Sequence, residues 1–181
     1  MADAREDWLD APDPGQRPAE LPFLALEDTF VSGDRTGRRF RIRYYRGADD
    51  DRLWGKILFG AGAQGPPDHV HGGAMAAILD EAMGGAAWQS GHPVVAANLD
   101  ISFRHMLPLD AACVVEARIT AADGRKITTT ATLRDRDGGQ VFAEGRGVFV
   151  VLEKRHLDAM SGKADVIVER MRRLREPEKD D

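Results

Sequence analysis

Apolar residues along this chain follow two spacings, one typical of β-strands and the other of a buried helix. In residues 39–46 basic and apolar side chains alternate, and residues 53–59 form a second strand-like run. From Gly72 to about Trp88 the alternation stops, and strong helix formers and apolar residues occupy every side of a helical wheel. This pattern predicts a helix that is buried on all sides.

Four further strand-like segments follow the helix, at residues 94–107, 111–121, 126–135 and 140–152, and turn residues separate them. In the first of these, alternate side chains define an apolar face and a polar face. The apolar face consists of Val95, Ala97, Leu99, Ile101 and Phe103. Two strands, one helix and four strands form an α+β order, and an antiparallel sheet wrapped around the helix uses all of these elements.

The chain divides into three regions. Residues 1–37 form an N-terminal arm that begins with many Asp, Pro, Ala and Gly residues, which predicts a loose, partly flexible segment. Residues 38–153 carry the predicted strands and helix and are expected to form one folded domain. Residues 154–181 place apolar side chains at roughly helical spacing before a charged end, which predicts an amphipathic helix and a frayed tail.

The composition is that of an ordinary globular protein. The 181 residues are 43% hydrophobic and carry a formal net charge of −5, so neither nucleic acid nor a membrane surface is an expected partner. Residues 1–15 lack the apolar core of a signal peptide, and no run of about 18 apolar residues predicts a membrane span. The single cysteine, Cys113, fits a reducing compartment, so we expect a cytoplasmic protein.

Two adjacent acids, Asp80 and Glu81, are the only charges in the predicted helix. A carboxylate in a low-dielectric interior costs several kcal/mol, so at least one of them should reach a cleft, an interface or a compensating partner. Such a carboxylate tends to have a shifted pKa, which suits a general base or a nucleophile. The alternative is a partly exposed helix whose two acids touch solvent, and the residues themselves do not choose between Asp80 and Glu81.

Gly72 and Gly73 stand where the predicted helix begins. Free backbone N–H groups and the positive end of the helix dipole meet at such a position, and glycine leaves room for a ligand oxygen. The pair can therefore form an oxyanion hole, although a plain junction between loop and helix has the same composition. Nearby, His69 and His71 invite a metal interpretation, but the sequence marks no third ligand, and no metal site is predicted.

The run from Gly65 to Gly84, with His71-Gly72-Gly73 and Asp80 inside it, resembles the signature of PaaI-type hot-dog-fold thioesterases. The similarity continues through residues 98–103, 107–109, 124–126 and 143–149, and it covers about residues 50–152. The resemblance implies a hot-dog fold, in which an antiparallel sheet wraps around a central helix. It also implies hydrolysis of a fatty or aromatic acyl-CoA, with coenzyme A as part of the substrate and no separate cofactor.

By the same resemblance, the active sites lie between the subunits of a homodimer or of a dimer of dimers. The backbone at Gly72 and Gly73 would bind the thioester carbonyl, and His71 would shape the pocket. Asp80 of the neighbouring subunit would activate water or attack the carbonyl itself. The basic turn at residues 123–126 is a solvated hairpin tip or a contact for nucleotide phosphate, which makes Arg125 and Lys126 candidates for substrate binding.

Two positions depart from the family pattern. Several relatives have a Ser or Thr where this chain has Ala96, and Asn98 is the nearby candidate to replace it. Some relatives have an Asn or Gln that binds the carbonyl where this chain has Gly65, and the adjacent Gln64 is the candidate to replace it in substrate binding. The missing hydroxyl motivates an alternative function, a non-catalytic acyl-CoA-binding or regulatory hot-dog protein. A hot-dog dehydratase is a third option, but its second motif is missing from the sequence.

Overall fold

The computed structural model describes residues 4–26, 28–47, 51–109, 111–159 and Glu169. Its helices are α1 (Ala4–Asp10), η1 (Pro22–Ala25), η2 (Ala61–Ala63), α2 (Gly72–Gln89) and α3 (Lys154–Ala159). Its strands are β1 (Gln16–Pro18), β2 (Phe40–Gly47), β3 (Leu53–Phe59), β4 (Val94–Phe103), β5 (Ala112–Asp123), β6 (Lys126–Asp135) and β7 (Val141–Val151). Most of the predicted C-terminal helix lies outside the described residues.

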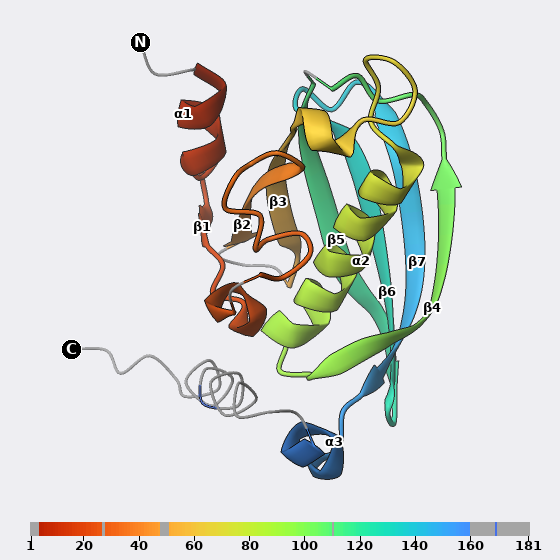
Figure 1. The fold of residues 1–181 in the computed structure, drawn as a ribbon. Helices are drawn as coiled ribbons and strands as arrows, with labels where there is room; N and C mark the ends of the chain where they lie inside the picture. The colour runs from red at the N-terminus through yellow and green to blue at the C-terminus, as the bar shows by residue number, and fades with distance from the viewer. Residues whose placement is uncertain (1–3, 27, 48–50, 110, 160–168, 170–181) are drawn as a thin grey trace, which may run out of the picture.

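All seven strands form one antiparallel sheet in the order β1-β2-β3-β5-β6-β7-β4. The sheet curves around α2, which lies across its concave face (Figure 1). This arrangement confirms the predicted α+β hot-dog fold. Because β4 pairs with β7 rather than with the strand that follows it, the first strand after the helix becomes an edge of the sheet.

The core lies between α2 and the sheet. Ile78, Leu79, Ala82 and Met83 on the helix have no exposed surface, and they meet the inward residues of the central strands. Close packing also explains Gly85, because a Cβ there would lie 2.7 Å from a methyl carbon of Leu53. Any larger side chain at this position would push the helix away from β3.

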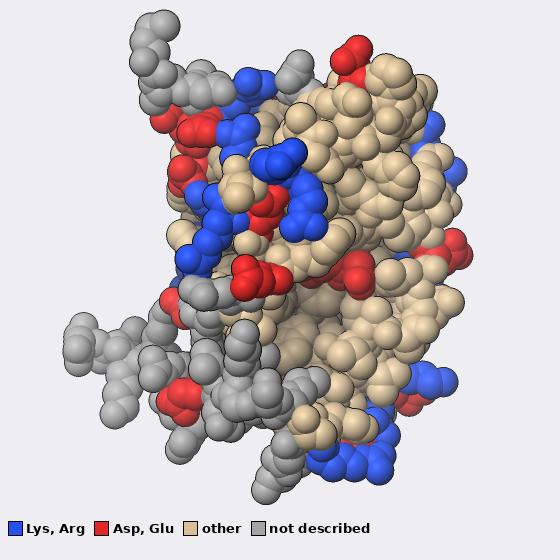
Figure 2. All heavy atoms as spheres, viewed as in Figure 1, with Lys and Arg blue, Asp and Glu red and all other residues tan. Residues whose placement is uncertain are grey.

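One side of α2 remains uncovered, contrary to the prediction of a helix buried all round. The sheet covers a single side, while η1 and the loop of residues 28–39 cover only part of the opposite side (Figure 1). The stripe that lines the pocket on this side has helical spacing and consists of Ala77, Asp80, Glu81, Gly84 and Trp88, and the loop contacts it at Glu81. Figure 2 shows a hollow on this face of the molecule with acidic side chains at its rim.

The N-terminal arm contains more regular structure than its composition predicted. Strand β1 extends the sheet by pairing with β2, and α1 lies near β2 and β3. The buried Lys56 on β3 binds this arm, because its Nζ donates to the carbonyl oxygen of Ala11 at 2.6 Å and to Asp13 at 2.7 Å. The same ammonium lies 5.2 Å from the ring centroid of Trp8 on α1, a cation–π distance.

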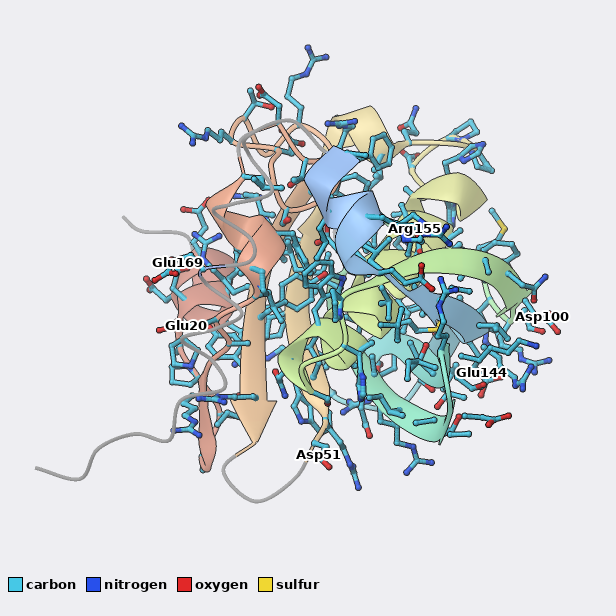
Figure 3. All side chains as sticks on the ribbon, turned by 90° about the horizontal axis from the view of Figure 1, so that it is seen from below. Glu20, Asp51, Asp100, Glu144, Arg155 and Glu169 are labelled. Atoms are coloured by element: carbon cyan, nitrogen blue, oxygen red, sulfur yellow. The ribbon has the colours of Figure 1, made fainter. Side chains whose placement is uncertain are left out.

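Strand β4 is exposed over most of its length. Its apolar side chains keep large exposed fractions, 47% for Val95, 36% for Leu99 and 53% for Phe103. A bulge between Ala96 and Asn98 shifts the register with β7, so the predicted apolar face does not continue through the whole strand. Figure 3 shows Asp100 and Glu144 at the rim of the molecule on this side. An exposed apolar edge strand of this kind is a surface on which another chain can pair.

Glu81 connects α2 to the loop of residues 28–39. One carboxylate oxygen accepts the hydroxyl of Tyr44 on β2 at 2.9 Å, and the other accepts the N–H and hydroxyl of Ser32, both at 3.3 Å. Tyr44 is buried, and burial together with the Glu81 carboxylate holds its pKa well above the usual range, so its hydroxyl remains a donor. These contacts hold the loop against the helix.

Replacing Glu81 should therefore destabilise the fold. We expect Glu81→Ala to lower the free energy of unfolding by roughly 2 kcal/mol, since it leaves the buried Tyr44 hydroxyl without its acceptor. Glu81→Gln retains an acceptor oxygen of the same shape and should lose less than half of that amount. Urea unfolding followed by circular dichroism measures both variants, and equal stability of Glu81→Ala and the wild type would contradict this role.

Candidate active site

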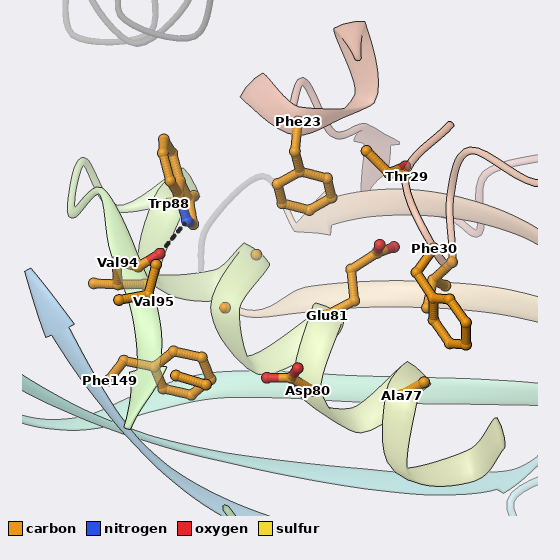
Figure 4. Close-up of a pocket in the computed structure, with 14 residues that line it drawn as sticks. Phe23, Thr29, Phe30, Ala77, Asp80, Glu81, Trp88, Val94, Val95 and Phe149 are labelled. Atoms are coloured by element: carbon orange, nitrogen blue, oxygen red, sulfur yellow. Dashed lines mark hydrogen bonds between the residues drawn. The ribbon is translucent and has the colours of Figure 1, made fainter. Parts of the chain in front are cut away.

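Asp80 lies at the wall of a pocket of about 300 Å³ above α2 (Figure 4). Aromatic and aliphatic side chains from five parts of the chain surround it. They are Phe23 from η1, Phe30 and Val31 from the loop, Trp88 from α2, Val94 and Val95 from β4, and Phe149 from β7. The indole N–H of Trp88 donates to the carbonyl oxygen of Val94 at 3.1 Å, which fixes one wall. The pocket suits an apolar ligand that ends beside a carboxylate.

The two acids of α2 differ in what surrounds them. In Figure 4 the Glu81 carboxylate points towards the side of Thr29 and Phe30, whereas the Asp80 carboxylate points towards the side of Phe149. Glu81 is held by Tyr44 and Ser32, but among the described residues no hydrogen bond reaches the Asp80 carboxylate. Burial raises the pKa of Asp80 above the usual range of an aspartate. Asp80 is thus the carboxylate available to a ligand.

His71 caps the N-terminus of α2 with its side chain. Its Nδ1 accepts the N–H of Gly73 at 2.9 Å, so in the neutral ring the proton resides on Nε2. The carbonyl oxygen of His71 accepts the N–H groups of Ala74 and Met75. Within the described part of the chain, no hydrogen bond uses the N–H of Gly72. Of the two N–H groups predicted to bind the carbonyl, that of Gly73 already donates to His71, and that of Gly72 remains open to a ligand.

Asp80 and the glycine pair are too far apart in one chain to bind the same carbonyl group. Eight residues of helix separate Gly72 from Asp80, a rise of about 12 Å. Neither glycine lines the pocket of Asp80. Gly72 borders a hollow beside Phe103 and Met106 at the exposed end of β4, and Gly73 and His71 border another beside Gln64. A single chain therefore carries both components of the predicted site without bringing them together.

The other predicted binding residues lie at separate places. Gln64 is near His71, since both border the hollow at the N-terminus of α2. Asn98 is exposed on β4 and pairs with Val148 of β7. Arg125 and Lys126 lie at the tip of the β5–β6 hairpin, which pairs with the end of β7 on the side opposite the start of β4.

The contacts of Arg125 explain its position at that tip. One guanidinium nitrogen lies 2.6 Å from a carboxylate oxygen of Glu153, and another donates to the carbonyl oxygen of Val151 at 3.3 Å. The side chain thus holds the hairpin against the end of β7. Its predicted contact with substrate phosphate stays a prediction.

Ala96 lines the same pocket as Asp80. This is the place expected of the residue that aligns with the Ser or Thr of several relatives. The pocket also has walls that the sequence did not indicate, at Phe23, Phe30, Val31 and the hydroxyl-bearing Thr29. They belong to an arm without helical or strand periodicity, so no pattern in the sequence links them to α2. The Glu81–Ser32 contact, made between residues 49 positions apart, brings them there.

Other reactive groups do not form a competing site in the described residues. No group of three or more His, Cys, Asp or Glu residues could hold a metal ion there. Burial, with a contribution from Asp135, raises the pKa of the Cys113 thiol to about 12, which makes it a poor nucleophile. In the same part of the chain, no helix is long and apolar enough to cross a membrane.

Comparison with known proteins supports the resemblance seen in the sequence. Residues 68–142, which include His71, Gly72, Gly73 and Asp80, match the thioesterase superfamily. The acyl-coenzyme A thioesterase THEM4 of Bos taurus is 30% identical over 130 residues, which are 72% of this chain and 54% of that protein. This chain therefore spans about half the length of that curated relative.

Solved structures agree with the fold. One thioesterase superfamily protein is 33% identical in sequence, with a TM-score of 0.57 over 60% of this chain and 53% of the other. The PaaI protein of E. coli, from the phenylacetic acid degradation operon, is 16% identical and has a TM-score of 0.56 over 63% of this chain and 80% of the other. Together with the curved sheet around α2, these similarities show that the chain belongs to the hot-dog-fold thioesterase superfamily.

Proposed function

We propose that this protein hydrolyses the thioester of an acyl-CoA to a free acid and coenzyme A. The observation that carries the proposal is the Asp80 carboxylate, which faces an apolar pocket of about 300 Å³ while its neighbour Glu81 is held by Tyr44 and Ser32. An apolar pocket accommodates an acyl chain, and a carboxylate of raised pKa at its wall is suited to take a proton. The curated relative named as an acyl-CoA thioesterase supports the same assignment.

The chemistry requires a nucleophile, a proton acceptor and a donor for the carbonyl oxygen. In one version Asp80 accepts a proton from water as the water oxygen attacks the thioester carbon. In the other, the Asp80 carboxylate attacks that carbon itself and water then hydrolyses the resulting anhydride. In both, the carbonyl oxygen becomes an oxyanion that the N–H of Gly72 can bind, and the carbon–sulfur bond breaks as the carbonyl reforms. The departing thiolate takes a proton from Asp80 in the first version and from water in the second, and leaves as the thiol of coenzyme A.

The working site needs two chains. Gly72 and Asp80 are about 12 Å apart along one helix, so one thioester carbonyl cannot contact both within one subunit. The exposed strand β4 begins at the Asp80 pocket, where Val94 and Val95 form a wall. It ends at the hollow beside Gly72, where a ring carbon of Phe103 would lie 3.4 Å from a Cβ added to Gly72. Antiparallel pairing of β4 with a second copy would bury its apolar side chains and bring Gly72 of one chain towards Asp80 of the other.

A non-catalytic acyl-CoA-binding protein is the second candidate, and Ala96 favours it. This residue lines the Asp80 pocket without a hydroxyl that could orient water. Such a protein would bind acyl-CoA without releasing thiol. Measuring thiol release over a panel of acyl-CoAs of different chain length separates the two functions.

Hydrolysis should depend on the carboxylate of Asp80. Asp80→Asn should lower kcat for acyl-CoA hydrolysis by about 100-fold or more, since the amide cannot accept the proton. Steady-state thiol release measures this change. Glu81→Gln, which alters the adjacent acid, should retain most of the wild-type kcat and serves as the matched control. If Asp80→Asn kept wild-type turnover, the assignment of Asp80 would be wrong.

The pH dependence follows from the raised pKa of Asp80. The base acts when ionised, so kcat/KM should fall as the pH drops through a pKa above the usual aspartate value of about 4, and Asp80→Asn should lose this dependence.

The free energy of unfolding should change with pH in the opposite direction. In this range the folded protein retains a proton on Asp80 that the unfolded chain has released, so stability falls as the pH rises. At pH 7 Asp80→Asn should therefore melt at or above the wild-type temperature in calorimetry.

The exposed edge gives the next prediction. Leu99→Lys should prevent pairing through β4, so the variant should sediment as a monomer and lose hydrolysis, whereas the wild type sediments as a dimer or larger assembly. Leu24→Lys is the control, since Leu24 is similarly exposed, at 38%, but lies on η1. Analytical ultracentrifugation and thiol release test both variants. A Leu99→Lys monomer with full activity would show that one chain suffices.

A further inference from the structure

A second pocket, of about 550 Å³, lies in the loop of residues 28–39 and is rich in arginine. Its lining contains three arginines, Arg35, Arg38 and Arg39, and two acids, Asp28 and Asp34. Thr29, Gly33, Thr36 and Gly62 complete the lining. Figure 2 shows blue Lys and Arg side chains gathered around acidic ones on the face that also carries the hollow over α2.

Asp34 organises this loop through hydrogen bonds to its backbone. Its carboxylate accepts the N–H groups of Arg39 at 2.7 Å, Phe40 at 3.1 Å and Thr36 at 3.2 Å, and the Thr36 hydroxyl at 2.6 Å. Burial opposes its ionisation, but hydrogen bonds from Thr36, Arg39 and Phe40 outweigh this effect and hold the pKa of Asp34 below the usual range. The carboxylate is thus committed to the loop backbone, and the arginine side chains surround a preorganised concave surface.

The side chain of Arg39 is held in place as well as its backbone. Its guanidinium carbon lies 4.8 Å from the ring centroid of Phe30, and its Nε lies 3.8 Å from the Asp34 carboxylate. Stacking on an aromatic ring leaves the edge of a guanidinium group available to an oxyanion. Phe30 is itself a wall of the Asp80 pocket, so the same side chain separates the acid from the arginines.

The arginine pocket adjoins both parts of the candidate active site. Thr29 lines this pocket and the pocket of Asp80. Arg39 and Gly62 line this pocket and the hollow that contains His71 and Gly73. A ligand whose phosphates lie among the arginines therefore has two short routes to the reacting groups, one over Thr29 and one over Arg39.

We propose that this arginine pocket binds the phosphate groups of the nucleotide end of the acyl-CoA substrate. Arginine recognises phosphate through paired N–H donors, and a coenzyme A thioester carries its phosphates at the end opposite the reacting carbonyl. The inference rests on the proposed thioesterase function. It assigns phosphate binding to Arg38 and Arg39, whereas Arg125 at the β5–β6 hairpin is paired with Glu153.

The test compares two thioesters that carry the same acyl group, one on coenzyme A and one on pantetheine, which lacks the nucleotide and its phosphates. Arg38→Ala and Arg39→Ala should each raise KM for the CoA thioester about tenfold or more, with kcat changed by less than about twofold. KM for the pantetheine thioester should not change. Arg39→Lys retains the charge and controls for loss of the loop structure, and Arg118→Ala on the exposed face of β5 is the matched surface control.

Binding of adenosine 3′,5′-bisphosphate, measured by calorimetry, provides a readout that needs no catalysis. The wild type should bind it more tightly than ADP or inorganic phosphate, and both alanine variants should weaken it. Equal KM values for the CoA thioester in the wild type and both variants, with unchanged bisphosphate binding, would overturn the arginine assignment while the thioesterase stands. Bisphosphate binding that depends on these arginines, without hydrolysis of either thioester, would instead refute the proposed hydrolysis and support the pocket.

Discussion

The structure depends on how one helix accommodates two adjacent carboxylates. A buried carboxylate is costly unless hydrogen bonds compensate it, and α2 contains Asp80 and Glu81 side by side in an otherwise apolar sequence. Glu81 is compensated by the hydroxyl of Tyr44 and by Ser32. That compensation brings the loop of residues 28–39 onto the helix, and the loop then supplies walls for the pocket that Asp80 faces. One acid thus builds the site, and the other remains available for chemistry.

In the proposed function, the same loop would connect the two ends of a long substrate. Its Phe30 contributes to the apolar pocket, while Arg38 and Arg39 line the adjacent basic pocket. The proposed carbonyl-binding group, the N–H of Gly72, lies about two helical turns from Asp80, beside the exposed end of β4. The proposed pairing of this exposed apolar strand with a second copy of the chain would complete the site. Under that proposal, assembly and catalysis depend on the same edge.

Much of the fold follows from local patterns in the sequence. The bounds of β3 and β6 match the predicted segments, and α2 extends one residue beyond the predicted helix, because alternation and the Ala-rich run report local burial directly. The sequence did not separate Asp80 from Glu81, since their difference arises from Tyr44 and Ser32, which are distant along the chain. The pocket walls at Phe23 and Phe30 were missed for the same reason. The exposure of Leu99 also depends on strand order, which alternation does not encode.

A crystal structure with a non-hydrolysable acyl-CoA analogue tests the division of roles between the two acids most directly. The account predicts that the analogue's carbonyl carbon lies within reach of the Asp80 carboxylate, directly or through one water, with its oxygen on the N–H of Gly72 from the partner subunit. It also predicts that Glu81 keeps its hydrogen bonds to Tyr44 and Ser32. A carbonyl group placed against Glu81, with those bonds broken and Asp80 remote from the ligand, would contradict it.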